Sequence, residues 1–134
     1  MKLITRDTDY AARALIFMAS TKGETVTVST LVSKLRIPRP FLRQILQALN
    51  KDGILKSYKG SGGGFRLALP PEKIFLTDLM KIFQGALKLN ECIFKKKVCP
   101  NKNLCPLRSK ISLIEENVIS QLNSITIASL LRIR

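Results

Sequence analysis

Two short predicted helices separated by a proline-marked turn, and followed by a glycine-tipped hairpin, constrain the fold of this chain most strongly. Residues 28–35 and the segment that begins at Pro40 each place apolar side chains three and four positions apart, which predicts one apolar face per helix. Pro38 and Pro40 end the first helix and Gly53 ends the second. Residues on both sides of the run GSGGG (60–64) alternate in polarity, which predicts two strands. This order is typical of a winged helix-turn-helix.

Other apolar segments predict three further helices around this unit. The stretch 9–20 is dense in apolar residues, and Asp7 or Thr8 is placed to cap its first amides. Thr77 is placed to cap a short helix that stops at Gly85. The last helix has roughly 20 residues, and it bears one apolar stripe made of Leu107, Ile111, Ile114, Val118, Leu122 and Ile125.

We therefore expect a mainly α fold with a small β-hairpin: a winged helix-turn-helix plus a long C-terminal dimerisation helix. The expected boundaries are 1–85 for the winged helix-turn-helix, 86–105 for a cysteine loop, and 106–134 for the dimerisation helix and tail. The apolar stripe has two possible packing partners: its own domain, and the same helix of a second chain. Both are expected, because a long amphipathic helix on so small a domain exposes more apolar surface than one partner covers.

Positive charge is concentrated on the winged segment. The whole chain has 23 Lys and Arg against 9 Asp and Glu, a net charge of +14, and between residues 34 and 66 eight cations accompany only Asp52. Such a surface favours a polyanionic partner, and in this fold double-stranded DNA; the alternative is a solvated basic surface on a protein-binding winged helix. The candidate DNA contacts are Arg39, Pro40, Arg43, Gln44 and Gln47 on the second helix and Lys59, Ser61 and Gly62 in the wing.

The three cysteines, Cys92, Cys99 and Cys105, lie in one basic segment that has no apolar period. The chain has no histidine, which excludes histidine-based catalytic dyads and mixed cysteine-histidine zinc sites. Nearby lysines favour the thiolate form that metals require. An iron-sulfur cluster, a zinc or other metal site, a thiol redox switch and inert cysteines all fit the spacing. No signature of a substrate pocket or general base accompanies them, so we expect no enzyme; a cysteine-based redox protein is the weaker alternative.

Several motifs point to one family. They are the opening MKLITRDTDYAARAL, the segment RIPRPFLRQILQALNKDGIL, the wing KGSGGGF, the three-cysteine loop that ends in CPLR, and the tail NSITIASLL. With these, nearly the whole chain resembles the winged-helix repressors that include the iron-sulfur cluster regulator (IscR) and the nitric-oxide-sensing repressor (NsrR). The resemblance implies a homodimer on a palindromic operator, with a 2Fe-2S or 4Fe-4S cluster held by the three cysteines and a fourth ligand.

The fourth ligand differs within that family. In the cluster regulator it is a histidine three residues after the last cysteine, where this chain has Arg108. In the nitric-oxide sensor it is an aspartate near the N-terminus of the other subunit, and Asp9 falls at the matching place. Asp9 can also be explained without a metal, because the helix dipole favours an acidic residue in the first turn of a helix. Asp7 and Glu91 are further candidates.

Together these features predict a cytoplasmic, homodimeric DNA-binding repressor whose operator affinity is set by an iron-sulfur cluster that senses nitric oxide, oxygen or cluster status. The alternative is a winged-helix regulator that uses the three cysteines for thiol redox or zinc sensing. No membrane partner is expected, because no apolar run approaches the 18 residues of a transmembrane helix and the opening segment is no secretory signal.

Overall fold

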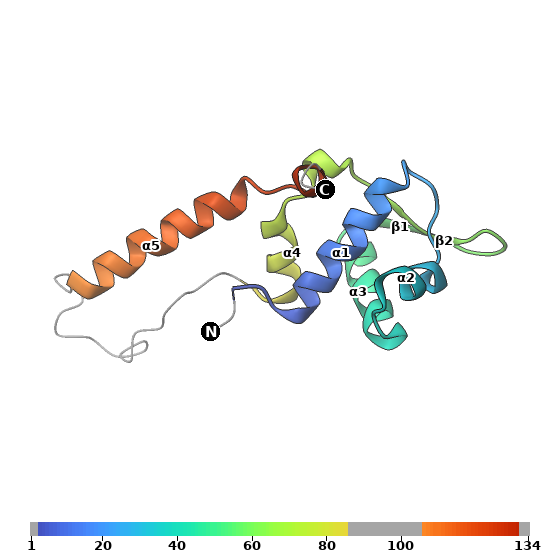
Figure 1. The fold of residues 1–134 in the computed structure, drawn as a ribbon, viewed down its shortest axis with the longest axis horizontal. Helices are drawn as coiled ribbons and strands as arrows, with labels where there is room; N and C mark the ends of the chain where they lie inside the picture. The colour runs from blue at the N-terminus through green and yellow to red at the C-terminus, as the bar shows by residue number, and fades with distance from the viewer. Residues whose placement is uncertain (1–2, 86–105, 132–134) are drawn as a thin grey trace.

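The computed structural model describes residues 3–85 and 106–131 and has a helical body, a hairpin at one side, and one long helix that extends away from the body (Figure 1). This arrangement confirms the predicted mainly α fold with a small β-hairpin. In chain order the elements are α1 (Arg6–Ser20), α2 (Val28–Leu35), α3 (Arg39–Lys51), β1 (Leu55–Tyr58), β2 (Gly64–Leu67), the 3-10 helix η1 (Pro71–Lys73), α4 (Leu76–Phe83), α5 (Pro106–Asn123) and α6 (Ile127–Leu131).

The core lies where α1 crosses α2, α3 and α4. The apolar face that the helical spacing predicts for α3 is buried, and so is the centre of α1, where Ala11 and Ala14 leave room for neighbouring backbones. From these helices and the strands, one continuous cluster includes Leu15, Met18, Leu31, Leu42, Ile45, Leu46, Leu49, Ile54 and Leu55. Burial of these faces against one another, more than local propensity, accounts for the stability of such short helices.

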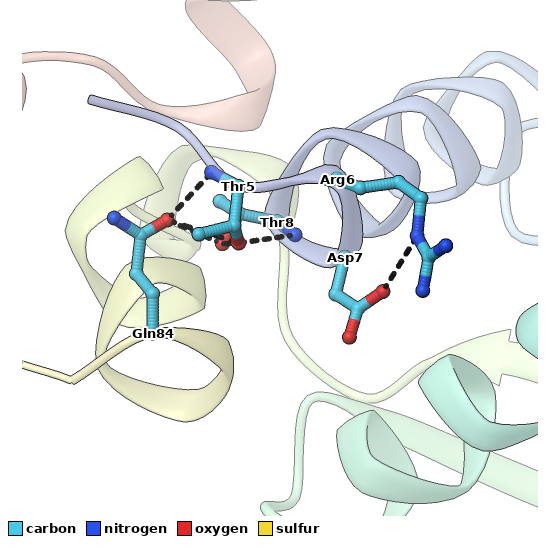
Figure 2. Close-up of polar contacts among 5 residues, drawn as sticks. All are labelled: Thr5, Arg6, Asp7, Thr8 and Gln84. Carbon is cyan, nitrogen blue, oxygen red and sulfur yellow. Dashed lines mark hydrogen bonds and ion pairs between the residues drawn. The ribbon is translucent and has the colours of Figure 1, made fainter. Parts of the chain in front are cut away.

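Helix α1 begins earlier than the sequence predicts. Its N-cap is Thr5, in an extended conformation with φ −79° and ψ 165°, and the Thr5 hydroxyl accepts a hydrogen bond from the Thr8 amide (Figure 2). The prediction that Asp7 or Thr8 caps the helix was therefore wrong. Both residues lie inside the first turn, where Asp7 and Asp9 are still favoured by the helix dipole.

The turn between α2 and α3 contains one residue in the left-handed conformation. Arg36, with φ 56°, ends α2, and its amide donates to the Val32 carbonyl at 2.9 Å. Ile37 is then buried and Pro38 precedes α3. Proline was predicted at the first position of α3, whereas Pro40 occupies the second position, after Arg39. The missing proline N–H costs nothing there, because first-turn amides have no partner within the helix.

The hairpin pairs β1 and β2 in antiparallel register and has two unlike faces. Leu55 lies opposite Leu67 and Ser57 opposite Phe65 on the face toward the core, while Lys56 lies opposite Arg66 on the outer face. The amide and carbonyl of Phe65 also exchange two hydrogen bonds of 2.8 Å with Val26, which joins the hairpin to the segment before α2. Strand β2 is thus hydrogen-bonded on both edges, to β1 on one and to Val26 on the other.

The C-terminal elements differ from expectation in two details. Thr77 does not cap α4, which begins at Leu76 because the Asp78 carboxylate accepts from the Phe75 amide at 3.1 Å. Helix α5 ends at Asn123, so Ile125 lies beyond it.

A short helix at the end of the described chain returns to the body. The Leu76 amide donates to the Ile125 carbonyl at 3.0 Å, and the Ile127 amide donates to the Ile74 carbonyl at 2.9 Å. These bonds place α6 against η1 and α1, and Ile127 is fully buried in the main core cluster. The core of the winged domain therefore includes residues beyond 106. Among the described residues, no helix is both long and apolar enough to cross a membrane.

Candidate nucleic-acid interface

Helix α3 presents a row of polar side chains on the face opposite its buried residues. Because the buried face consists of Leu42, Ile45, Leu46 and Leu49, the helical period turns the polar positions of α3 outward. The structure brings together five predicted contact residues in this way, and all of them are exposed: Arg39, Pro40, Arg43, Gln44 and Gln47. Arginine and glutamine are side chains that hydrogen-bond base edges and phosphates in a major groove.

The positive charge of this surface is not neutralised by neighbouring acids. Within residues 3–85 and 106–131, no ion pair involves a cation of α3 or the hairpin. Arg39 is held by a different contact, because its Nη2 donates to the Ser29 hydroxyl at 3.0 Å and so ties α3 to the first turn of α2. Unpaired cations on one face create the field that attracts a polyanion.

The wing supplies a second group of predicted contacts. Lys59, Ser61 and Gly62 are exposed at the tip of the hairpin, as expected. The tip closes with a hydrogen bond of 2.9 Å from the Gly63 amide to the Gly60 carbonyl. A short, exposed tip of this kind can approach a nucleic-acid backbone closely, since glycine brings no side chain between them.

A third group lies on the outer face of the hairpin strands, where the sequence analysis counted cations but named no contact residues. Lys56 and Arg66 are directly opposite each other, a pairing of like charges that destabilises an isolated hairpin. Arg66 lies over the Tyr58 ring at 5.3 Å, and its Nη2 donates to the Thr25 hydroxyl at 3.1 Å. A phosphate beside this face would relieve the repulsion. The polarity alternation of the strands carried this signal, since Lys56, Tyr58 and Arg66 are the outward positions.

We expect replacement of Gly64 by alanine to loosen the wing. Gly64 has φ +150°, and an added Cβ would meet the Val26 carbonyl oxygen far inside van der Waals contact. Strain of this kind costs about 1–3 kcal/mol, and urea unfolding measures it. Gly62→Ala is the matched control, because Gly62 also has positive φ but open space around its Cβ position. Equal losses for the two variants would show that the close approach to Val26 is unimportant.

Of the predicted cluster ligands and the further candidates, the structure describes Asp9 and Asp7, both in the first turn of α1. Cys92, Cys99, Cys105 and the further candidate Glu91 lie outside the described residues. The side chain of Asp9 is 45% exposed on α1, and its Oδ2 accepts from Arg13 Nε at 2.9 Å, one helical turn away. Within the described ranges, no three cysteine or acidic side chains gather into a metal-binding group. Asp9 is thus accessible to ligands from outside its own helix.

The predicted apolar stripe on α5 is largely uncovered. Its C-terminal end packs on α4, where Leu122 is buried. Toward the other end, Leu107, Ile114 and neighbouring Leu113 are 67%, 52% and 55% exposed. Leu107 and Ile114 lie on one face of a helix that projects from the body (Figure 1), and exposed apolar side chains on such a face mark an interaction surface.

Comparison with known proteins agrees with this geometry. The Rrf2 family, described as an iron-dependent transcriptional regulator, matches residues 4–133. A putative HTH-type transcriptional regulator of Aquifex aeolicus is 32% identical over 92% of this chain and 88% of its own length. The HTH-type transcriptional regulator NsrR of Bacillus subtilis is 32% identical over 78% of this chain and 68% of its own length.

A solved structure shows the same fold along the whole chain. CymR, the global cysteine regulator of Bacillus subtilis, superposes with a TM-score of 0.82 and 19% identity and covers 100% of this chain and 99% of its own. The winged helix-turn-helix fold and the resemblance seen in the sequence are thereby confirmed. This chain belongs to the Rrf2 family of transcriptional regulators.

Proposed function

We propose that this regulator is a homodimeric repressor that binds a palindromic operator through α3 and the wing. The observation that carries the proposal is the exposed row on α3, whose arginines and glutamines have no acidic partner within the described residues and continue toward the cationic hairpin. Twofold pairing through α5 would present two such rows to the two half-sites of an operator. The relatives are transcriptional regulators, and a regulator of this kind needs no catalytic residue.

We further propose that an iron-sulfur cluster, held by Cys92, Cys99, Cys105 and Asp9, controls operator affinity. Three thiolates and one carboxylate suit iron, and the family description and the similarity to NsrR support the choice. When bound, the cluster supplies iron that reacts with nitric oxide or oxygen. The Asp9–Arg13 pair does not oppose this role, because an exposed pair one helical turn apart contributes only about 0.3–0.5 kcal/mol.

The proposed division of the chain places the control segment between the two functional surfaces. Residues 86–105 connect the winged helix-turn-helix of residues 1–85 to the dimerisation helix and tail of residues 106–134, of which α6 packs back on the winged core. A change in the cysteines would therefore act on the joint between α4 and α5, and so on the relative placement of the two copies of α3.

The alternative function is thiol redox or zinc sensing by the same cysteines. It is favoured by the similarity over the whole chain to CymR, described as a global cysteine regulator. Both functions share the DNA interface and differ in what the cysteines bind.

Anaerobic purification with visible absorption, iron, zinc and sulfide analysis tests the choice. We expect wild type to carry iron and sulfide, Cys99→Ser to lose both, and Asp9→Ala to lose part or to shift the spectrum, because a ligand is removed. Glu72→Ala is the matched control, since it removes an exposed acid in η1, away from the cysteines in sequence. Wild type that binds DNA without iron and sulfide would contradict the cluster, and its zinc content would then separate zinc from thiol sensing.

A further inference from the structure

The side-chain amide of Gln84 joins the end of α4 to the first turn of α1 (Figure 2). Its Oε1 accepts from the Thr5 amide at 3.1 Å, from the Thr5 hydroxyl at 3.3 Å and from the Thr8 hydroxyl at 2.7 Å. Its Nε2 donates to the Leu3 carbonyl at 2.9 Å. These partners are 76 to 81 positions away in the chain, so the cluster is a tertiary contact between two helices.

The buried position of Thr8 makes this contact specific. Thr8 is fully buried and is the polar member of an otherwise apolar core in the described part of the chain. A buried hydroxyl requires partners, and that of Thr8 contacts Gln84 Oε1 and, at 3.1 Å, the Thr5 hydroxyl. An apolar side chain at position 84 would remove the shorter of these contacts. Gln84 therefore fixes α1 relative to α4 through polar geometry that apolar packing cannot replace.

The cluster lies between the two parts of the molecule that the proposed function must connect. Gln84 precedes the cysteine-bearing segment 86–105 by two residues. On the other side, Arg6 follows Thr5, and its guanidinium lies 4.3 Å from the centre of the Phe41 ring in the first turn of α3. A continuous set of contacts thus runs from the point where the cysteine segment leaves the body to the helix that carries the DNA contacts.

We propose that Gln84 is a positioning residue that couples the state of the cysteines to α3. This inference rests on the proposed function, because it takes the cysteine segment to be the control element. Any displacement at the end of α4 is transmitted to the first turn of α1 by the four hydrogen bonds of Gln84, and then to α3 by the contact between Arg6 and Phe41. Coupling of this kind has a measurable size, namely the ratio of two affinities.

The test compares operator affinity before and after the cysteines are alkylated with iodoacetamide, in the full-length protein. We expect wild type to change its Kd by about tenfold, within the usual range of allosteric coupling. Gln84→Met, of similar size but without the amide, and Thr8→Val, without the hydroxyl, are expected to reduce this ratio to near one. Gln84→Glu is the matched control: it keeps the acceptor for the three bonds from Thr5 and Thr8, loses only the donation to the Leu3 carbonyl, and should keep most of the ratio.

Hydrogen exchange provides a readout that does not depend on DNA. In wild type, alkylation is expected to change amide protection in the first turns of α1 and α3, and in Gln84→Met it should not reach α3. A ratio unchanged by Gln84→Met and by Thr8→Val, in variants that remain folded, overturns the role of Gln84 and leaves the proposed function standing. A wild-type Kd that alkylation leaves unchanged, together with unchanged amide protection, overturns the control of operator affinity by the cysteines and, with it, the role of Gln84.

Discussion

Replacement of Ile114 by glutamate should dissociate the proposed dimer and sharply reduce operator binding. Ile114 lies on the uncovered stripe of α5 with its side chain mostly exposed in the monomer, so the substitution leaves the core intact. In a twofold interface through this stripe the new carboxylate would occur twice among apolar side chains, where an unpaired charge is strongly disfavoured. We expect the dimer Kd to rise about 100-fold or more, because two burials at about 1.5–3 kcal/mol each are lost.

Sedimentation equilibrium measures the dissociation, and gel-shift titration measures its effect on DNA. A monomer reaches only one half-site, so operator affinity should fall further than any single contact explains. Ser109→Glu is the matched control, because it adds the same charge to α5 on the face opposite the stripe. If the Ile114→Glu protein dimerises at the same concentrations as wild type, the assignment of α5 to the dimer interface is wrong.

The main features of the fold could be predicted because they depend on local pattern. Each of α2 and α3 buries one apolar face, and the spacing of Leu42, Ile45 and Leu46 is visible in the sequence. The start of α1 and the cap of α4 were misplaced because several polar residues near each end can act as caps. The choice of Thr5 over Asp7 as N-cap depends on the backbone conformation at that point, which the sequence alone does not reveal.

Non-local contacts account for what the sequence did not predict. Helix α6 has only five residues and owes its place to backbone bonds and to the burial of Ile127 beside Ile74. The Gln84 cluster joins residues more than seventy positions apart, and a glutamine before a glycine has no local signature. At the candidate interface, the helix row and wing tip were predicted from residue type, whereas the pairing of Lys56 with Arg66 required the strand register.

Removal of the Arg43 side chain is expected to cause the largest loss at the DNA surface. Arg43 lies in the middle of the exposed row of α3, one turn after Arg39, and has no partner within the described residues that would hold it away from DNA. An arginine that reads a base contributes about 1–3 kcal/mol. Because the proposed dimer has two copies of α3, Arg43→Ala should cost about 2–6 kcal/mol, or at least about 30-fold in Kd.

The dependence of binding on salt separates base reading from simple charge. If Arg43 contacts a base, Arg43→Ala should weaken specific binding far more than binding to unrelated DNA. Lys59→Ala should instead weaken both alike and lower the salt slope by about one per half-site, because a phosphate contact releases a counterion. Lys81→Ala removes an exposed charge from α4, outside α3 and the wing, and controls for net charge. Equal losses for Arg43→Ala and Lys81→Ala would mean that α3 attracts DNA without reading it.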